Sequence, residues 1–396
     1  MEGKQWEVVV DVTKFKRILL SILLLVLSVQ SAFAEMMEKG KTKVKTLLNV
    51  YNQKSNTGKQ VLDNSGNEKV TVIEPEIFVK HQITADTEIN ASFTIDTWTA
   101  ESDTILDGNT GASGSGKKGQ SRVAPTIGVR REAGKNKYGM NLGFSSEYDY
   151  TSKNISADFE RSFADDNFTV GLGAQYYAET VGLFTDITPP ASAKMTKDLN
   201  RDIYAVNLGV SQILTRRDIV EAGVTYAHSK GYLESTAGTV NISGTREVEA
   251  LPEKRERSAI STKWVHALTD EMAFNLSYRN YFDDWGSHAH TGRAAFLIAL
   301  REEQDFLEVA LRYHSQSAVD YYKDSFAAPD QFMTSDSDLS KFSSVEPSIM
   351  YSRYLGGLHI FGVKLQDAEW GNSLTYAKRN TGLNYTYLQT SLAFFF

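Results

Sequence analysis

The 396-residue sequence contains no cysteine and only 7 prolines. The lack of cysteine excludes disulfide bonds, a thiolate metal site and a cysteine nucleophile. Beyond the N-terminus no apolar run approaches the roughly 20 residues that a membrane-spanning helix needs, which excludes a helical membrane bundle. Any segment of the remaining chain that crosses a membrane must therefore be a strand. The formal net charge of -7 at pH 7 argues against a nucleic-acid partner.

The N-terminus has the three parts of a secretory signal peptide. Lys16 and Arg17 precede an apolar run over residues 18–29, and a small-x-small pattern ends at Ala34. We predict cleavage after Ala34, which makes residues 1–34 a signal peptide and residues 35–396 a single mature domain. The alternative is an uncleaved anchor, but the apolar run is shorter than the roughly 20 residues of a membrane span.

From Lys43 onward, segments of about ten residues alternate between apolar and polar side chains, a pattern typical of transmembrane strands. Tyr138 and Met140, for example, point to one face, whereas Asn141 and Gly143 point to the other. The sequence predicts an all-β fold: an antiparallel, up-and-down transmembrane β-barrel of roughly sixteen strands, within a range of about fourteen to eighteen. We expect the barrel to be closed, because no water in the hydrocarbon layer satisfies the backbone of an edge strand.

Short turns and long loops alternate along the chain, as expected for a barrel with short turns at one end and long loops at the other. The long loops include residues 230–255 and 317–341, and a tight turn is expected at residues 355–357. The even number of strands puts both termini at the short-turn end.

The last segment alternates up to the final residue, with Leu388, Leu392, Phe394 and Phe396 on one face. A terminal aromatic residue on such a strand resembles the C-terminal signal of Gram-negative outer-membrane barrels. We therefore expect Phe396 to be read by the barrel-insertion machinery, and we expect the lipid bilayer of the outer membrane as the surrounding medium. A soluble β-sandwich is the alternative, but it leaves the apolar outer face of so many strands unexplained.

Side chains of the opposite parity would face the lumen. We expect acids to dominate the first half of the barrel and bases the second, which would create a transverse field that orients polar solutes. A second interpretation is that neighbouring strands pair these charges as structural ladders, and a third is a specific binding site. The candidate pore-lining residues are Asp96, Arg130, Glu147, Lys263, Arg279, Arg293, Glu308 and Arg312.

Polar and aromatic residues also cluster at the predicted pore mouth, where they form a rim motif of Asp283, Asp284, Trp285, His288 and Tyr322. His288 and His290 share a face and could chelate a transition metal, but a third ligand of clear spacing is missing. A polar surface cluster is the alternative. We expect no bound metal.

The sequence carries no recognised enzyme motif. No histidine lies in a recognised nucleophile context, and the chain has no Walker or dinucleotide-binding glycine motif. We therefore expect no catalytic residue, no cofactor and no enzymatic activity.

Three stretches of the second half carry a family resemblance: REVEALPEKRERSA from Arg246, LSYRNYFDDWGSHAHT from Leu276 and LRYHSQSAVDYY from Leu311. They resemble the family designated domain of unknown function three-five-seven-zero, which is found in exported Gram-negative proteins. The resemblance implies an outer-membrane barrel but no settled activity. It also hints at a multi-component envelope system with a redox element.

These observations predict a channel or porin-like protein for small polar solutes. The alternative is a non-conducting barrel scaffold that holds a periplasmic or surface partner, such as a redox protein, in an envelope complex. Assembly of several copies of the chain is left open by the sequence.

Overall fold

The computed structural model describes residues 36–55, 69–100, 120–147, 149–184, 195–234, 238–301, 304–360 and 362–396. The predicted signal peptide and its cleavage site lie outside these residues. In the part of the chain that is described, no helix has both the length and the apolar character needed to cross a membrane.

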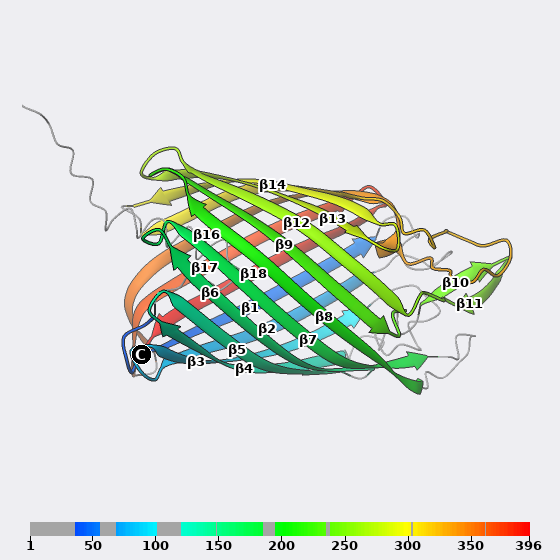
Figure 1. Ribbon diagram of the computed structural model, residues 1–396, viewed down its shortest axis with the longest axis horizontal. Coiled ribbons are helices and arrows are strands. Elements are labelled where there is room, and N and C mark those ends of the chain that lie inside the picture. The colour runs from blue at the N-terminus through cyan, green and yellow to red at the C-terminus, as the bar shows by residue number, and fades with distance from the viewer. Residues whose placement is uncertain are drawn as a thin grey trace, which may run out of the picture.

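Sixteen antiparallel strands form a closed barrel, and each is hydrogen-bonded to the strands before and after it (Figure 1). The first strand pairs with the last, so the predicted up-and-down barrel of about sixteen strands is confirmed. The barrel strands are β1 (Thr42–Ser55), β2 (Lys69–Gln82), β3 (Thr87–Ala100), β4 (Gln120–Ala133), β5 (Asn136–Ser146), β6 (Tyr150–Phe163), β7 (Phe168–Phe184), β8 (Met195–Ile213), β9 (Asp218–Gly231), β12 (Lys254–Ala267), β13 (Met272–Asp283), β14 (His288–Leu300), β15 (Asp305–Gln316), β16 (Phe342–Ile360), β17 (Val363–Arg379) and β18 (Leu383–Phe395).

The two faces of the barrel wall differ as the alternating sequence predicts. Ile127 and Leu311 are 61% and 52% exposed, whereas Glu160 and Glu308, on the other parity, are only 3% and 8% exposed. Because apolar side chains cover the outside and polar side chains the inside, the exposed apolar surface has the character of a lipid-facing belt.

Two short turns are closed by the same kind of hydrogen bond, from a backbone N–H group to a threonine hydroxyl. The hydroxyl oxygens of Thr215 and Thr269 accept hydrogen bonds from the backbone N–H of Arg217 (3.0 Å) and Glu271 (3.2 Å). Threonine therefore closes the β8–β9 and β12–β13 turns by bonding to the backbone two residues ahead. These turns lie at the same end of the barrel as the C-terminus (Figure 1).

The turn predicted at residues 355–357 is wrong. This segment lies inside β16, where the register with β17 shifts on both sides of Gly356 and Gly356 has a φ of +69°. The glycine pair therefore marks a β-bulge, and the chain turns near Gly362 instead.

Two small elements are not part of the barrel wall. β10 (Thr239–Ile242) and β11 (Thr245–Val248) form a hairpin whose turn residues Ser243 and Gly244 have φ of +50° and +90°. The 3-10 helix η1 (Ser337–Leu339) lies in the loop between β15 and β16. The hairpin lies beyond the barrel end opposite to the C-terminus (Figure 1).

Candidate functional site

The lumen wall is lined by ion pairs between strands, most of them direct neighbours; Arg130 of β4 reaches Asp158 of β6 across Gly139 of β5. Arg130 lies 2.9 Å from Asp158, and Lys263 lies 3.0 Å from Glu221. Three further pairs are Arg122 with Asp96, Arg293 with Glu308, and Arg312 with Glu346. Six of the eight candidate pore-lining residues therefore belong to cross-strand pairs, which is the ladder arrangement considered above.

The other two pore-lining candidates behave differently. Arg279 is exposed on the lumen face of β13, and it has no ion pair among the described residues. Glu147 lies in the short loop after β5, and partial burial, reinforced by the nearby Asp149, raises the pKa of its carboxyl group. Arg279 is thus the candidate whose charge is available to a passing solute.

Ion pairs within each wall offset part of the expected separation into an acidic and a basic wall. The sequence analysis missed three lumen-facing bases in the first half: Arg122, which pairs with Asp96, Lys137, whose Nζ lies 3.7 Å from Glu160, and Arg201, whose Nε lies 2.5 Å from Glu179. These pairs reduce the field that a count of charges along the sequence suggests. The missed residues have the correct strand parity, so parity applied to every base would have found them.

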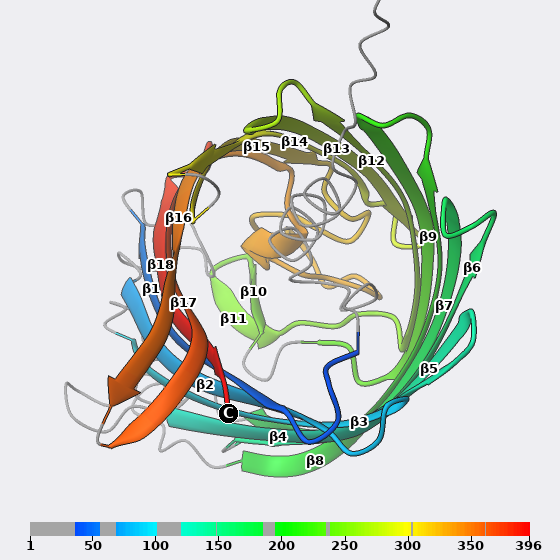
Figure 2. The same cartoon turned by 90° about the vertical axis from the view of Figure 1, so that its left-hand side faces the viewer.

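Two loops interlock at the end of the barrel away from the C-terminus, and together they are called the cap: residues 232–234 and 238–253 of one loop and residues 317–341 of the other. Val240 and Ile242 of the first bury against Phe326 and Met333 of the second. Bridges join Ile242 to Phe326 and Ala250 to Met333. Viewed along the barrel, these segments lie within the ring of strands (Figure 2).

A buried polar contact strengthens the cap. The hydroxyl group of Thr334 donates to the carboxylate of Glu249 at 2.8 Å, and both residues are at least nine-tenths buried. Because a buried carboxylate without partners is costly, this contact specifies which loops meet.

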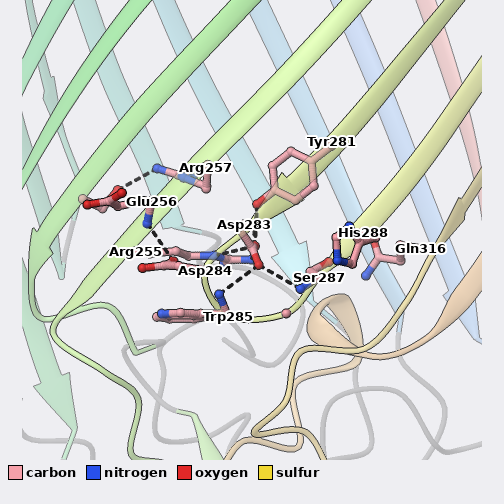
Figure 3. Close-up of polar contacts among 12 residues, drawn as sticks. Arg255, Glu256, Arg257, Tyr281, Asp283, Asp284, Trp285, Ser287, His288 and Gln316 are labelled. Carbon is pink, nitrogen blue, oxygen red and sulfur yellow. Dashed lines mark hydrogen bonds and ion pairs between the residues drawn. The ribbon is translucent and has the colours of Figure 1, made fainter.

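The rim motif connects the cap to the barrel through Asp283, whose side chain is fully buried (Figure 3). Its carboxylate oxygen Oδ2 accepts two hydrogen bonds from the Arg255 guanidinium (2.6 and 3.0 Å) and one from the hydroxyl of Tyr281 (2.7 Å). The backbone N–H groups of Trp285 (3.1 Å) and Ser287 (2.9 Å) donate to its other oxygen. Asp283 therefore holds the start of β12 and the β13–β14 loop in one arrangement.

Trp285 extends this connection to both cap loops. Its ring is 2% exposed, lies 4.3 Å from the Arg255 guanidinium and packs with Leu251 and Val319. Tyr322 packs against the same cluster. Asp284 has a smaller role, accepting one bond from the backbone of Glu256 at 2.8 Å. The rim motif thus consists mainly of groups that position the cap.

Gly286 fits this loop for two reasons. Its φ is +85°, and a Cβ atom there would collide with the carboxylate of Asp320 in the cap. Only glycine satisfies both the backbone conformation and the close approach.

His288 and His290 share the outer face of β14, and the structure provides no metal site around them. His290 Nδ1 lies 2.6 Å from the hydroxyl of Tyr278 and 3.2 Å from the amide of Asn280. His288 is exposed, and its backbone N–H donates to Ser317 at 2.9 Å. Among the described residues no group of three His, Cys, Asp or Glu side chains is placed to hold a metal ion.

Arg379, at the end of β17, fastens the other side of the cap. It is 6% exposed and donates to the carboxylate of Asp338 (2.8 Å) and to the carbonyl of Ser337 (3.2 Å). Its guanidinium lies 3.5 Å from the ring centre of Phe342. Gln316 adds bonds to the carbonyls of Asp338 and Ser340, both at 2.8 Å. The sequence analysis missed Arg379 because its contacts are with an irregular loop.

A chamber of about 580 Å³ with a mixed polar and apolar lining lies inside the barrel where the cap meets the wall. Its two arginines are paired, Arg312 with Glu346 and Arg379 with Asp338, so their charges are balanced. Three tyrosines and two hydroxyl side chains are among the other lining residues. The lining residues are Tyr51, Gln53, Arg312, His314, Asp338, Phe342, Ser344, Glu346, Thr375, Arg379, Leu383, Tyr385 and Tyr387.

Comparisons with solved structures give several barrels of similar form. A bacterial polysaccharide outer membrane secretin is 9% identical, with a TM-score of 0.48 over 91% of this chain and 99% of that chain. OpdK of Pseudomonas aeruginosa, crystallised with vanillate, is 7% identical, with a TM-score of 0.44 over 90% and 98%. A loop-deletion mutant of OmpT, an outer membrane protein of Vibrio cholerae, is 9% identical, with a TM-score of 0.43 over 90% and 100%.

The barrel assignment rests on the chain's own strand pairing, because likenesses of this strength do not bear on activity. No curated protein sequence matches the chain. A family model described as a protein of unknown function, DUF3570, matches residues 22–368. The match covers most of the chain and confirms the resemblance seen in the second-half motifs: the chain belongs to the DUF3570 family.

Proposed function

We propose that the protein is an outer-membrane channel for small polar solutes, with the cap restricting its mouth at the long-loop end. The observation that carries this proposal is the division of the closed wall into an apolar outer face and a polar, ion-paired inner face. The outer face suits a bilayer, and the inner face suits water and dissolved polar molecules.

The chamber beside the cap favours the passage of small solutes that are uncharged or zwitterionic. Its arginines are already paired with carboxylates, so they offer hydrogen bonds to a solute without a strong net charge. We therefore expect weak selectivity between cations and anions. The proposal includes no bond-making step.

Planar-bilayer recordings of the purified mature protein test this proposal. We expect discrete channel currents and, across a salt gradient, a reversal potential close to that of a weakly selective pore. The Asp283→Ala variant, in which the cap is loosened, should conduct more than the wild type. If both proteins fold, as judged by heat-modifiable mobility on gels, yet both stay silent, the channel proposal fails and a scaffold for an envelope partner takes its place.

The proposal also includes export and location. We infer that the chain is cleaved after Ala34 and inserted into the outer membrane with the help of Phe396. N-terminal sequencing of protein from the outer-membrane fraction should begin at residue 35. Recovery of the processed chain in the soluble periplasm would contradict this part of the proposal.

A further inference from the structure

Three lysines lie in register on three of four neighbouring strands at the long-loop end of the barrel, and they are called the lysine row. Lys378 near the end of β17 lies opposite Asn384 of β18, which lies opposite Lys54 near the end of β1. Lys54 in turn lies directly opposite Lys69 at the start of β2. All three lysines are exposed. The four strands are neighbours in the wall (Figure 2).

The lysine row points away from the lumen. Lys378 shares its strand parity with Leu374, which is 44% exposed, and Lys69 shares its parity with Ile73, which is 48% exposed. Because side chains two residues apart lie on the same face of a strand, the lysines lie above the lipid-facing belt.

The outer face beneath the lysine row changes character in two steps of about 7 Å each, the rise of two residues along a strand. The first step down is polar: Tyr376, Thr386, Asn52 and Thr71. The second is apolar: Leu374, Leu388, Val50 and Ile73. Ammonium, hydroxyl or amide, and hydrocarbon thus follow one another in the order of the phosphate, ester and acyl regions of a lipid.

Within the part of the chain that the structure describes, the lysine row lacks an acidic partner. None of the three lysines has an ion pair among the described residues, whereas the polar row below bonds internally, with Asn52 donating to Thr71 at 2.9 Å. Like charges placed directly opposite on two strands, such as Lys54 and Lys69, destabilise the pairing unless an anion lies between them.

The opposite part of the outer rim is balanced in charge. Lys230 of β9 lies between Asp202 of β8 and Lys254 of β12. His228 lies 3.7 Å from the carboxylate of Glu256. Lys230 and Lys254 have no ion pair among the described residues either, but acids face outward on the neighbouring strand positions there. The described outward positions around the lysine row carry no acid, so its positive charge is not balanced in the same way.

We propose that the lysine row binds the phosphate headgroup of a membrane lipid in the leaflet at the long-loop end. Two ammonium groups on adjacent strands provide the charge, and the polar and apolar rows receive the ester and acyl parts of the same molecule. This site depends on the membrane location proposed above but not on conduction through the lumen.

Native mass spectrometry of the detergent-purified mature protein, titrated with diphosphorylated lipid A or with phosphatidylcholine, tests the site. We expect the wild type to retain lipid A in preference to phosphatidylcholine. The variant Lys54→Gln/Lys69→Gln/Lys378→Gln should retain it on the order of 100-fold more weakly. The matched control Lys230→Gln/Lys254→Gln, from the balanced rim, should bind as the wild type does.

Two further arms separate the explanations. The variant Lys54→Arg/Lys69→Arg/Lys378→Arg keeps the charge and should keep the lipid, which shows that a loss in the glutamine variant is not misfolding. Inorganic phosphate alone should not displace the lipid, because it lacks the acyl chains.

Undiminished lipid A retention by the glutamine variant, or equal loss in the control, would overturn the proposal. If the glutamine variant loses lipid yet conducts normally, the lipid site stands apart from the channel; if the wild type never conducts but binds lipid as expected, only the channel proposal fails.

Discussion

The barrel wall and the cap are held together by different kinds of contact. In the wall, antiparallel ladders pair every barrel strand with two neighbours, and ion pairs such as Lys263–Glu221 add to these backbone bonds. In the cap, a few buried side chains join segments that are distant in sequence, such as Thr334 and Glu249, 85 residues apart. Loss of one side chain should therefore leave the wall intact but release the cap.

Replacement of Asp283 should give the largest effect. In the Asp283→Ala variant, the guanidinium of Arg255 loses its carboxylate partner while remaining largely buried, at a cost of about 3–5 kcal/mol to the local arrangement. Hydrogen exchange should accelerate in residues 317–341 without accelerating in the barrel strands. Asp284→Ala, which removes a single bond to the backbone of Glu256, is the control, and equal acceleration in both variants would contradict the role of Asp283.

Replacement of Arg379 should loosen the cap from its other side. Arg379→Gln removes the bonds to Asp338 and Ser337 and the stacking on Phe342, with an expected cost of about 1–3 kcal/mol. Limited proteolysis should then cut residues 317–341 more rapidly. The neighbouring Lys378→Gln faces outward and should leave the rate of cleavage unchanged; cleavage accelerated equally by both changes would argue for a general effect on β17.

Alanine substitutions at two glycines in or beside the cap should distinguish the cost of backbone strain from the cost of a steric collision. Gly286 and Gly244 both have positive φ, but only a Cβ atom at Gly286 would meet a neighbour, Asp320. Gly244→Ala should cost about 1–2 kcal/mol through backbone strain alone. Gly286→Ala should cost more, measured by exchange at residues 317–341, and a smaller effect at Gly286 would show that Asp320 gives way freely.

A wall residue should matter least to stability. Lys263→Gln breaks a lumen-facing pair but leaves the β9–β12 and β12–β13 ladders intact. Because Glu221 keeps 23% of its side chain open to the lumen and can be hydrated there, we expect a change of about 1 kcal/mol. The temperature at which the folded gel band disappears should shift little. A large drop would mean that the ion-pair ladder, and not the backbone, determines the stability of the wall.

Mild acid should strengthen the cap slightly. Burial raises the pKa of Asp336 above its ordinary value of 3.8, so the folded cap holds this proton more tightly than an unfolded loop does. The resulting stabilisation is complete at low pH and is lost as the pH rises through the raised pKa. Protection factors in residues 317–341, which are exchange rates corrected for the intrinsic pH dependence of amide exchange, should therefore rise as the pH is lowered through the raised pKa of Asp336. Asp336→Asn should remove this rise.

Most of the wall could be predicted from the sequence because its physics is local. Alternation over successive strands determines which side chains meet lipid, and closure follows from the need to satisfy the backbone. Gly356 is the exception: a glycine pair marks either a turn or a bulge, and only the register with β17 distinguishes them.

The cap could not be predicted in this way, because its loops lack periodicity and meet through Phe326 and Met333 far along the chain from Val240. One signal was present. The Ser243-Gly244 turn between alternating residues 239–242 and 245–248 is a short hairpin pattern. The rim motif was recognised as a cluster, but its burial, and therefore its role in positioning the cap, depends on Arg255 and Leu251, which the sequence leaves unconnected to it.

The seam between β1 and β18 has a consequence for biosynthesis. Residues 43–55 pair with residues 383–395, so the first strand to be made lacks one of its two neighbours until the last strand has been translated. A chain in transit must be protected from pairing its open edge with other polypeptides, which calls for a holding chaperone along the route. Deletion of the last strand would not shorten the cylinder but would open it along two edges at once.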